Sequence, residues 1–289
     1  MQLPPNYMEL YAQALRYDRV GDPYTAVKLL KKVTRLVPDW ADAYRSLGTI
    51  YTRRREWKPA FHYWSKAVAL DADDRDAWWQ LGLAAVALKR MRTAQTVWAK
   101  FGFDRLRYDQ PLGLQLQHDD GYEILWMQPL DASRARVVSI PHPGSGTRYR
   151  DLVLYDRRGQ KGYNVIRRRR VPIYRAVDTL KRSPYRTFSC LLHTGSEPAI
   201  EQLEKLCYEA GLGFEVWSNA TRAAVQPDPA RASEDERRAF PEYYSDLLPR
   251  PELGTALVAL AAVHPAEVER VLNDWQIISL QQYSDLRAY

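Results

Sequence analysis

The stretch that decides the fold is Ala41-Asp-Ala-Tyr-Arg-Ser-Leu-Gly48, which recurs 34 residues later as Arg75-Asp-Ala-Trp-Trp-Gln-Leu-Gly82. Each copy continues with a second apolar segment, in which an alanine and a tryptophan stand at matching positions. These residues are Ala60 and Trp64 in one copy and Ala94 and Trp98 in the other. A third and more divergent copy begins at Tyr7. Apolar residues recur three and four apart within each copy, which predicts two amphipathic helices per copy.

The repeated pattern resembles the tetratricopeptide repeat, in which a large residue, Leu-Gly, a tyrosine, an alanine, an aromatic residue and a proline recur over 34 residues. The resemblance covers residues 7–108 as three units, 7–40, 41–74 and 75–108. It implies a solenoid of three helix pairs, because one helix pair cannot bury its apolar face without a neighbour. The small residues Gly48 and Gly82 are expected where the two helices of a pair cross closely.

The remaining chain predicts a second, mixed region, so the fold class is α+β. From Leu112 onward, apolar and polar residues alternate, and Gly and Pro separate the short strands that this alternation predicts. A helix over 197–210 follows a strand and precedes another. Residues 109–225 are therefore predicted to form an α+β domain with an antiparallel sheet or a small barrel.

The last part of the chain is predicted to be a linker and a helical tail. Residues 226–238 are polar and contain prolines, which is typical of a linker. In residues 239–289, an Ala- and Leu-rich stretch predicts a helix over 252–263. A second helix is predicted over 265–279, with Pro265 near its start.

Composition excludes several classes of protein. Hydrophobic residues make up 46% and charged residues 27% of the chain, as in soluble globular proteins. The sequence has no run of about 18 apolar residues, so no membrane span is expected. The first residues lack the pattern of a signal peptide. Cys190 and Cys207 have no metal-type or redox spacing, so we expect reduced, buried thiols and a cytoplasmic protein. The net charge of +7 is compatible with an acidic partner.

The tetratricopeptide resemblance implies a groove lined by the first helices of the units. Its predicted contact residues are Tyr11, Leu15, Arg45, Thr49, Arg53, Trp79 and Leu83. Relatives that hold an acidic chaperone C-terminus place Lys, Asn and Arg where this chain has Tyr11, Leu15, Asp76 and Gln80, so that role is not implied. An apolar, aromatic groove with two arginines is suited to an amphipathic helix. Alternatively, later segments of the same chain cover the groove.

No catalytic or metal-binding pattern is present. None of the five histidines has the spacing of a metal site. His118-Asp-Asp120 is more typical of a turn before a strand. The loop Pro143-Gly-Ser-Gly-Thr-Arg148 lacks the Gly-Lys-Ser/Thr ending of a phosphate loop and precedes a strand instead of a helix. We therefore expect a protein that is not an enzyme and has no cofactor and no metal.

A basic cluster supports an alternative function. Arg167, Arg168, Arg169 and Arg170 are consecutive, and Tyr163, Tyr174 and Tyr185 are interspersed with further basic residues nearby. Arginines beside aromatic rings can bind phosphates and stack on bases. Because alternate residues of a strand face opposite sides, the four arginines form one patch only on a bent or edge strand. A solvated edge that blocks aggregation is the other interpretation.

The sequence thus favours a non-enzymatic protein that binds another protein through the groove, the α+β domain or both. The second domain resembles segments of repeat proteins from bacterial toxin–immunity systems. That resemblance implies an adaptor or immunity role, with a toxin or secreted effector as partner. Nucleic acid bound by the arginine cluster is the alternative.

Overall fold

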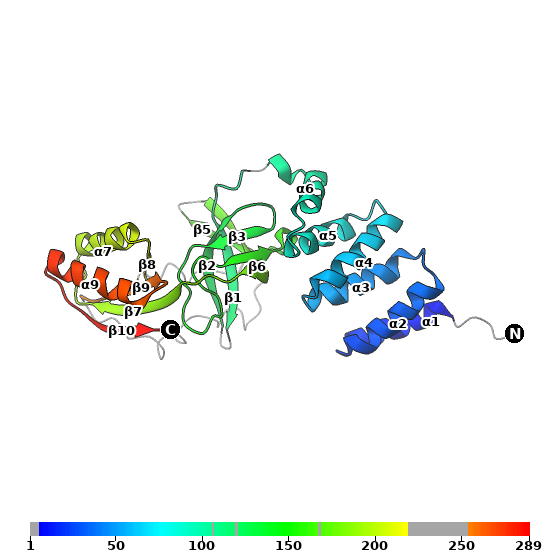
Figure 1. The fold of residues 1–289 in the computed structure, drawn as a ribbon, viewed down its shortest axis with the longest axis horizontal. Helices are drawn as coiled ribbons and strands as arrows, with labels where there is room; N and C mark the ends of the chain where they lie inside the picture. The colour runs from blue at the N-terminus through cyan, green and yellow to red at the C-terminus, as the bar shows by residue number, and fades with distance from the viewer. Residues whose placement is uncertain (1–5, 106, 119–120, 167–168, 219–253) are drawn as a thin grey trace. The chain divides into compact units, whose positions relative to one another are not determined.

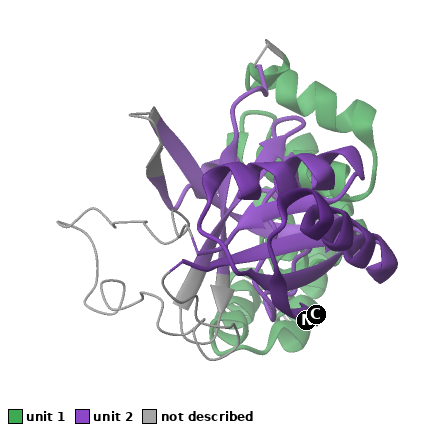
Figure 2. Ribbon diagram, turned by 90° about the vertical axis from the view of Figure 1, so that its left-hand side faces the viewer, with its two compact units in different colours: residues 1–106 green, residues 107–289 purple. Residues whose placement is uncertain are grey.

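The computed structural model describes residues 6–105, 107–118, 121–166, 169–218 and 254–289. The chain divides into two compact units, residues 1–106 and residues 107–289, which Figure 2 shows in different colours. The predicted linker at 226–238 and the part of the predicted tail before residue 254 lie outside the described residues.

Unit 1 consists of three helix pairs. The pairs are α1 (Tyr7–Arg19) with α2 (Pro23–Leu36), α3 (Ala41–Arg53) with α4 (Trp57–Leu70), and α5 (Arg75–Ala87) with α6 (Met91–Lys100). The first helices begin 34 residues apart, at the predicted starts of the three units. A short 3-10 helix over Phe103–Arg105 follows α6.

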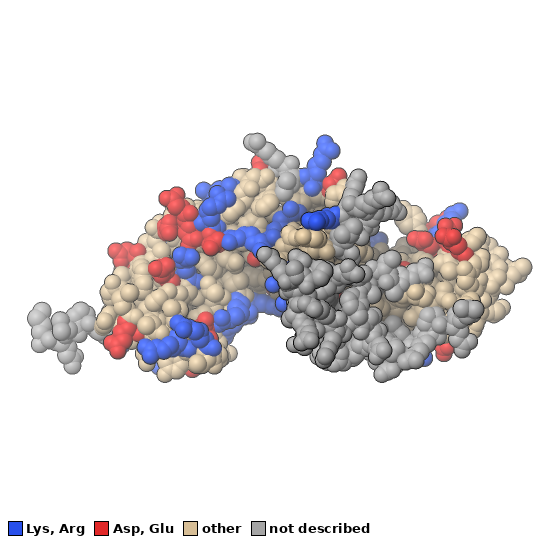
Figure 3. Space-filling model, turned by 180° about the vertical axis from the view of Figure 1, so that it is seen from behind, with Lys and Arg blue, Asp and Glu red and all other residues tan. Residues whose placement is uncertain are grey.

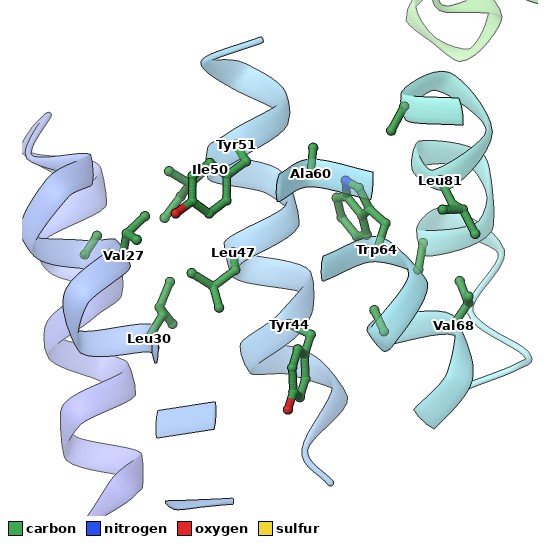
Figure 4. Close-up of a cluster of buried hydrophobic side chains, with 14 of the residues drawn as sticks. Val27, Leu30, Tyr44, Leu47, Ile50, Tyr51, Ala60, Trp64, Val68 and Leu81 are labelled. Carbon is green, nitrogen blue, oxygen red and sulfur yellow. The ribbon is translucent and has the colours of Figure 1, made fainter. Parts of the chain in front are cut away.

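Each helix pair packs through a small residue on the first helix and a large one on the second. A Cβ atom added to Gly48 would lie 2.6 Å from Trp64, and one added to Gly82 would lie 2.7 Å from Trp98. The indole rings therefore fill the space that a side chain at the glycine would need. Leu30 and Leu47 point toward one another between α2 and α3, so the core continues from one pair to the next (Figure 4).

The first part of unit 2 is a closed barrel, one of the two arrangements that the sequence predicts for it; the simple antiparallel sheet is not formed. Its strands are β1 (Leu112–His118), β2 (Gly121–Pro129), β3 (Arg134–Val137), β4 (Leu152–Tyr155) and β6 (Arg169–Lys181). Successive strands pair antiparallel, and β1 closes the ring by pairing parallel with β6. The parallel pair follows from the odd number of strands. When strand direction alternates around a ring of five, the first and last strands run in the same direction. Strand β5 (Gly162–Ile166) forms a hairpin with β6 outside the ring.

The barrel interior is filled by the alternating leucines that the sequence indicates. Leu112, Leu114 and Leu116 belong to one buried cluster, together with Tyr155 of β4 and Tyr174 of the neighbouring strand β6. A Cβ atom on Gly113 would lie 2.7 Å from Ile173, so glycine permits the close approach of β1 and β6.

The second part of unit 2 is a four-stranded sheet with two helices. Its elements are β7 (Arg186–Leu192), α7 (Glu197–Glu209), β8 (Gly213–Val216), β9 (Ala256–Ala262), α9 (Pro265–Ser279) and β10 (Tyr283–Ala288). The sheet order is β10-β7-β9-β8. Among the described residues, which leave out 219–253 between β8 and β9, this β-α-β-β-α-β order is the ferredoxin-like arrangement. Helices α7 and α9 lie side by side over one face of the sheet (Figure 1).

The prediction of a helical tail was wrong. The predicted helix over 252–263 is instead strand β9, which pairs with β7 and β8 at the centre of the sheet. Every residue of β9 is buried. Val258 and Leu260 face the helices, whereas Leu257 and Ala259 face a cluster around Ile140 and Trp217. Burial on both faces removes the alternation that identifies a strand, so the run was indistinguishable from a buried helix.

The second helix of the predicted tail is confirmed as α9, and β10 then returns to pair with β7. Residues 254–289 are thus an integral part of the sheet. Cys190 on β7 and Cys207 on α7 are both free and buried in the core between sheet and helices. Burial raises the pKa of each thiol to about 12.

Candidate functional site

An open hollow lies on unit 1 between the first helices of the first two units. Its volume is about 330 Å³. Tyr11 and Leu15 of α1 line it, as do Arg45 and Thr49 of α3, and all four were predicted groove residues. The remaining lining residues are Asp18, Asp42, Ser46 and Ile50. The structure thus brings these four predicted residues together at one place.

Helical spacing and a direct hydrogen bond position the lining residues. Tyr11 and Leu15 stand four apart on α1, and Arg45 and Thr49 stand four apart on α3, so each pair shares one helix face. The Tyr11 hydroxyl lies 3.0 Å from the Ser46 hydroxyl, which connects the two helices across the hollow. The Tyr11 ring packs on Trp40 with centroids 4.6 Å apart, which fixes its orientation.

Arg45 is held by acids of the array itself. Its Nε lies 3.1 Å from Asp74 Oδ2, and its Nη1 lies 3.4 Å from Asp42 Oδ1. The Asp74 side chain is only 7% exposed, and its other oxygen accepts the backbone N–H groups of Asp76 and Ala77 at the start of α5. One carboxylate therefore caps α5 and pairs with α3.

Arg53 is also paired within the array. Both of its terminal nitrogens donate to the Asp18 carboxylate on α1. Hydrogen bonding to Asp18 raises the pKa of the Arg53 guanidinium. The two arginines of the predicted groove are thus paired with acids of the array, Arg53 with one of the preceding unit and Arg45 with two of its own unit. Three aspartates against two arginines leave the hollow slightly acidic.

Trp79 and Leu83 do not line this hollow, which corrects the expectation that they face an open groove. Both are 1% exposed. The Trp79 ring packs against Trp98, Phe101 and Phe103, with centroids 4.9, 5.1 and 5.5 Å away. Most residues of α5 are buried, so this helix is core on several sides. An all-round apolar sequence is the signal that predicts such burial.

The alternative site, the arginine cluster, is only partly described. Arg167 and Arg168 lie outside the described residues, and the structure does not describe the side chain of Arg169, where β6 begins. The exposed Arg170 lies over the Tyr163 ring, 4.6 Å from its centroid, and donates to the Tyr163 hydroxyl at 3.4 Å. Tyr174 is 5% exposed inside the barrel, so it cannot stack on a base.

The described residues contain no group of three or more His, Cys, Asp or Glu side chains that could hold a metal ion. The predicted turn at His118-Asp-Asp120 lies partly outside them. The loop Pro143–Arg148 leads into strand β4, as its sequence predicts, and Ser145 Oγ donates to the Thr147 carbonyl within it. Among the helices that the structure describes, none is long and apolar enough to cross a membrane.

The chain can be set beside protein families, curated proteins and solved structures. No protein-family model and no curated protein matches the chain. Among solved structures, MamA aligns with 34% of this chain and 57% of its own at 29% identity, with a TM-score of 0.32. The chain thus spans little more than half the length of MamA. YrrB, described as a tetratricopeptide-repeat protein with an unusual peptide-binding site, aligns with 33% of this chain and 49% of its own at 21% identity and a TM-score of 0.31.

The first tetratricopeptide repeat of RPAP3, solved with an HSP90 peptide, aligns with 32% of this chain and 75% of its own at 20% identity and a TM-score of 0.31. Residues 7–108 are a tetratricopeptide-repeat array. The 34-residue period, the glycine and tryptophan positions and the three stacked helix pairs carry this assignment.

Proposed function

We propose that the array binds a peptide segment of a partner protein in the hollow between α1 and α3. The observation that carries this proposal is the convergence of Tyr11, Leu15, Arg45 and Thr49 around one open depression. Leu15 and the Tyr11 ring supply apolar contact, and the exposed Thr49 supplies polar contact. Binding pockets typically combine an apolar lining with a few positioned polar groups.

The electrostatics of the hollow define the class of peptide. Asp18 and Asp42 line it, and Arg45 and Arg53 already pair with these two acids and with Asp74. An acidic peptide would have to break one of these ion pairs before it could gain an arginine. We therefore infer an uncharged or mildly basic peptide that carries an apolar side chain for the surface beside Leu15.

The sharper form of the proposal is an adaptor or immunity protein whose partner is one toxin or effector. Only the faint sequence resemblance of the second domain supports this form. Its test is purification of the full chain from its native host. A single partner in stoichiometric amount is the expected result, and a broad mixture of weakly held proteins would argue against it.

A matched pair of variants tests the hollow itself. Thr49 and Thr96 are both exposed, and each hydroxyl donates to the carbonyl four residues earlier, at 3.0 and 3.1 Å. Thr49→Arg places a long cation in the hollow, whereas Thr96→Arg makes the same change on α6. We expect Thr49→Arg to weaken affinity for a captured partner at least about tenfold, which is about 1.4 kcal/mol. Thr96→Arg should leave the affinity unchanged.

The experiment begins with affinity capture from the native host, followed by titration of the identified partner against each folded variant. Equal binding by both threonine variants and by Tyr11→Ala would contradict the proposal. That result would place the contact elsewhere on the chain, with the hollow covered by another segment.

The alternative function, nucleic acid binding by Arg167–Arg170, is supported within the described residues by the Arg170–Tyr163 pair. It predicts salt-sensitive oligonucleotide binding that is lost when the four arginines are changed to glutamate.

A further inference from the structure

The second helices of the array carry a one-sided charge. Helices α2, α4 and α6 together contain eight Lys and Arg residues and no Asp or Glu. The first helices, α1, α3 and α5, contain five basic and four acidic residues. Figure 3 shows one side of the array, on which red and blue side chains are interspersed. The lack of Asp and Glu thus distinguishes the second helices from the first helices of the same array.

The basic residues lie at matching positions of the repeat. Lys32, Lys66 and Lys100 occupy the same position in the three units, and all are exposed. Lys58 and Arg92 likewise match one another and are exposed. Because the units stack in regular order, side chains at one repeat position form a row across the array. Lys28 and Arg35 extend this basic row along α2. We call these seven residues the outer row.

No acid of the protein neutralises the outer row. Among the residues that the structure describes, none of the seven forms an ion pair with Asp or Glu. Lys100 instead lies over the Trp78 ring, 4.4 Å from its centroid. This contrasts with Arg45 and Arg53 on the first helices, both of which have carboxylate partners. Unscreened charges of one sign create a potential that attracts a polyanion.

We propose that the outer row binds the phosphate backbone of single-stranded nucleic acid. A row that repeats from helix to helix matches a linear polymer with regularly spaced charges better than the irregular charges of a folded acidic protein. The exposed ring of Tyr24 occupies the repeat position of Lys58 and Arg92, and the Arg54 guanidinium lies 4.3 Å from its centroid. An arginine–tyrosine stack beside a row of cations is a platform on which bases can stack.

A membrane surface is a poorer match. Insertion into lipid requires apolar side chains among the cations. The exposed large aliphatic side chains of these three helices are Leu36 and Leu70, the last residues of α2 and α4. Aliphatic contact is thus confined to the C-terminal ends of α2 and α4, beyond the last cations of the outer row on those helices.

The test is fluorescence anisotropy of the full chain with labelled single-stranded RNA and DNA of about 20 nucleotides, between about 50 and 200 mM salt. The test variant is Lys32→Glu with Lys66→Glu, which leaves the Lys100–Trp78 contact intact. Its matched control is Arg16→Glu with Arg19→Glu, two exposed cations on α1, because both variants change the net charge equally. Circular dichroism establishes that each variant is folded.

We expect the wild type to bind and Lys32→Glu/Lys66→Glu to lose about tenfold or more in affinity at low salt. Its log–log salt slope should become shallower by about 1.4, since each lost contact to a single strand contributes about 0.7. The Arg16/Arg19 control should stay within about twofold of wild type.

Three outcomes would overturn the proposal. Equal losses in both variants would mean that only net charge matters. Loss of binding in Arg170→Glu alone would place the nucleic acid on unit 2. Binding to vesicles of anionic phospholipid, with no binding to either oligonucleotide, would identify a membrane as the partner. None of these outcomes depends on peptide binding in the hollow, so the two proposals fail separately.

Discussion

The first and second helices of the array use their charges in different ways. On the first helices, arginines pair with aspartates of other helices, as Arg53 of α3 does with Asp18 of α1 and Arg45 of α3 does with Asp74, the N-cap of α5. On the second helices, the cations of the outer row have no carboxylate partners among the described residues. The same residue types therefore serve two purposes. Paired charges join one unit to the next, and unpaired charges are available to an outside partner.

The largest effect on stability is expected where the first and second helices of one unit pack together. Gly48→Ala would place a methyl group 2.6 Å from the Trp64 ring, so one of the helices must shift. Alanine favours a helix by up to about 1 kcal/mol over glycine, but overpacking typically costs about 1–3 kcal/mol. We expect a net loss of stability in urea unfolding followed by tryptophan fluorescence.

The first unit supplies the control for this prediction. It has Ala14 and Leu30 at the positions that Gly48 and Trp64 occupy in the second unit, and both are fully buried. Gly48→Ala combined with Trp64→Leu recreates that pair. The double variant should be more stable than the sum of the single effects indicates. Strict additivity would contradict a steric origin.

The second prediction concerns Asp74, which joins the first helices of two units. Asp74→Ala removes both the cap of α5 and the partner of Arg45, and loss of such a cap costs about 0.5–2 kcal/mol. Asp74→Asn keeps a capping oxygen and removes only the charge, so it should cost less. Equal destabilisation by the two variants, measured by urea unfolding, would show that the ion pair is the main contribution.

A smaller effect is expected at the rim of the hollow. The Arg53 side chain is 54% exposed, and exposed ion pairs contribute about 0–1 kcal/mol. Arg53→Ala should therefore lower the free energy of unfolding by less than about 1 kcal/mol. High salt should reduce the difference from wild type further, because it screens an exposed pair. A salt-independent loss above that range would mean that the side chain acts by packing.

The smallest effect on stability is expected on the outer row. Lys66 has no ion-pair partner among the described residues, so Lys66→Ala should change the free energy of unfolding by no more than about 0.5 kcal/mol. The comparison predicts that this variant weakens oligonucleotide binding while Arg53→Ala does not. A thermal melt of each variant checks the stability, and an anisotropy titration of the same two samples checks the oligonucleotide binding.

Periodic local features allowed the array and most strands to be predicted. The 34-residue pattern located all six helices, because each unit needs the same residues at the same crossings, as Gly48 and Gly82 illustrate. Strand β9 was mistaken for a helix because burial on both faces leaves no alternation along Ala256–Ala262. The sequence left a sheet and a small barrel open as alternatives, because the pairing of β1 with β6 that closes the barrel joins strands that are distant along the chain.

The candidate site was predicted only in part, because helical spacing indicates which residues share a helix face but not which distant residues contact them. Helical positions identified Tyr11, Leu15, Arg45 and Thr49 as neighbours, and they do line one hollow. The ion pairs of Arg45 and Arg53 were missed because their partners lie 29 and 35 residues away along the chain, Asp74 before α5 and Asp18 on α1. A search for opposite charges on neighbouring first helices would have found Asp18 and Arg53.

Site-specific photo-crosslinking in the native host tests the central claim most directly. A photoreactive amino acid replaces exposed Thr49 beside the hollow in one sample and exposed His62 in another, between Lys58 and Lys66 on α4. We predict a protein adduct that resists nuclease from position 49 and a nuclease-sensitive adduct from position 62. The same protein adduct from both positions, or nucleic acid at position 49, would contradict the claim that the first helices bind a protein and the second helices bind nucleic acid.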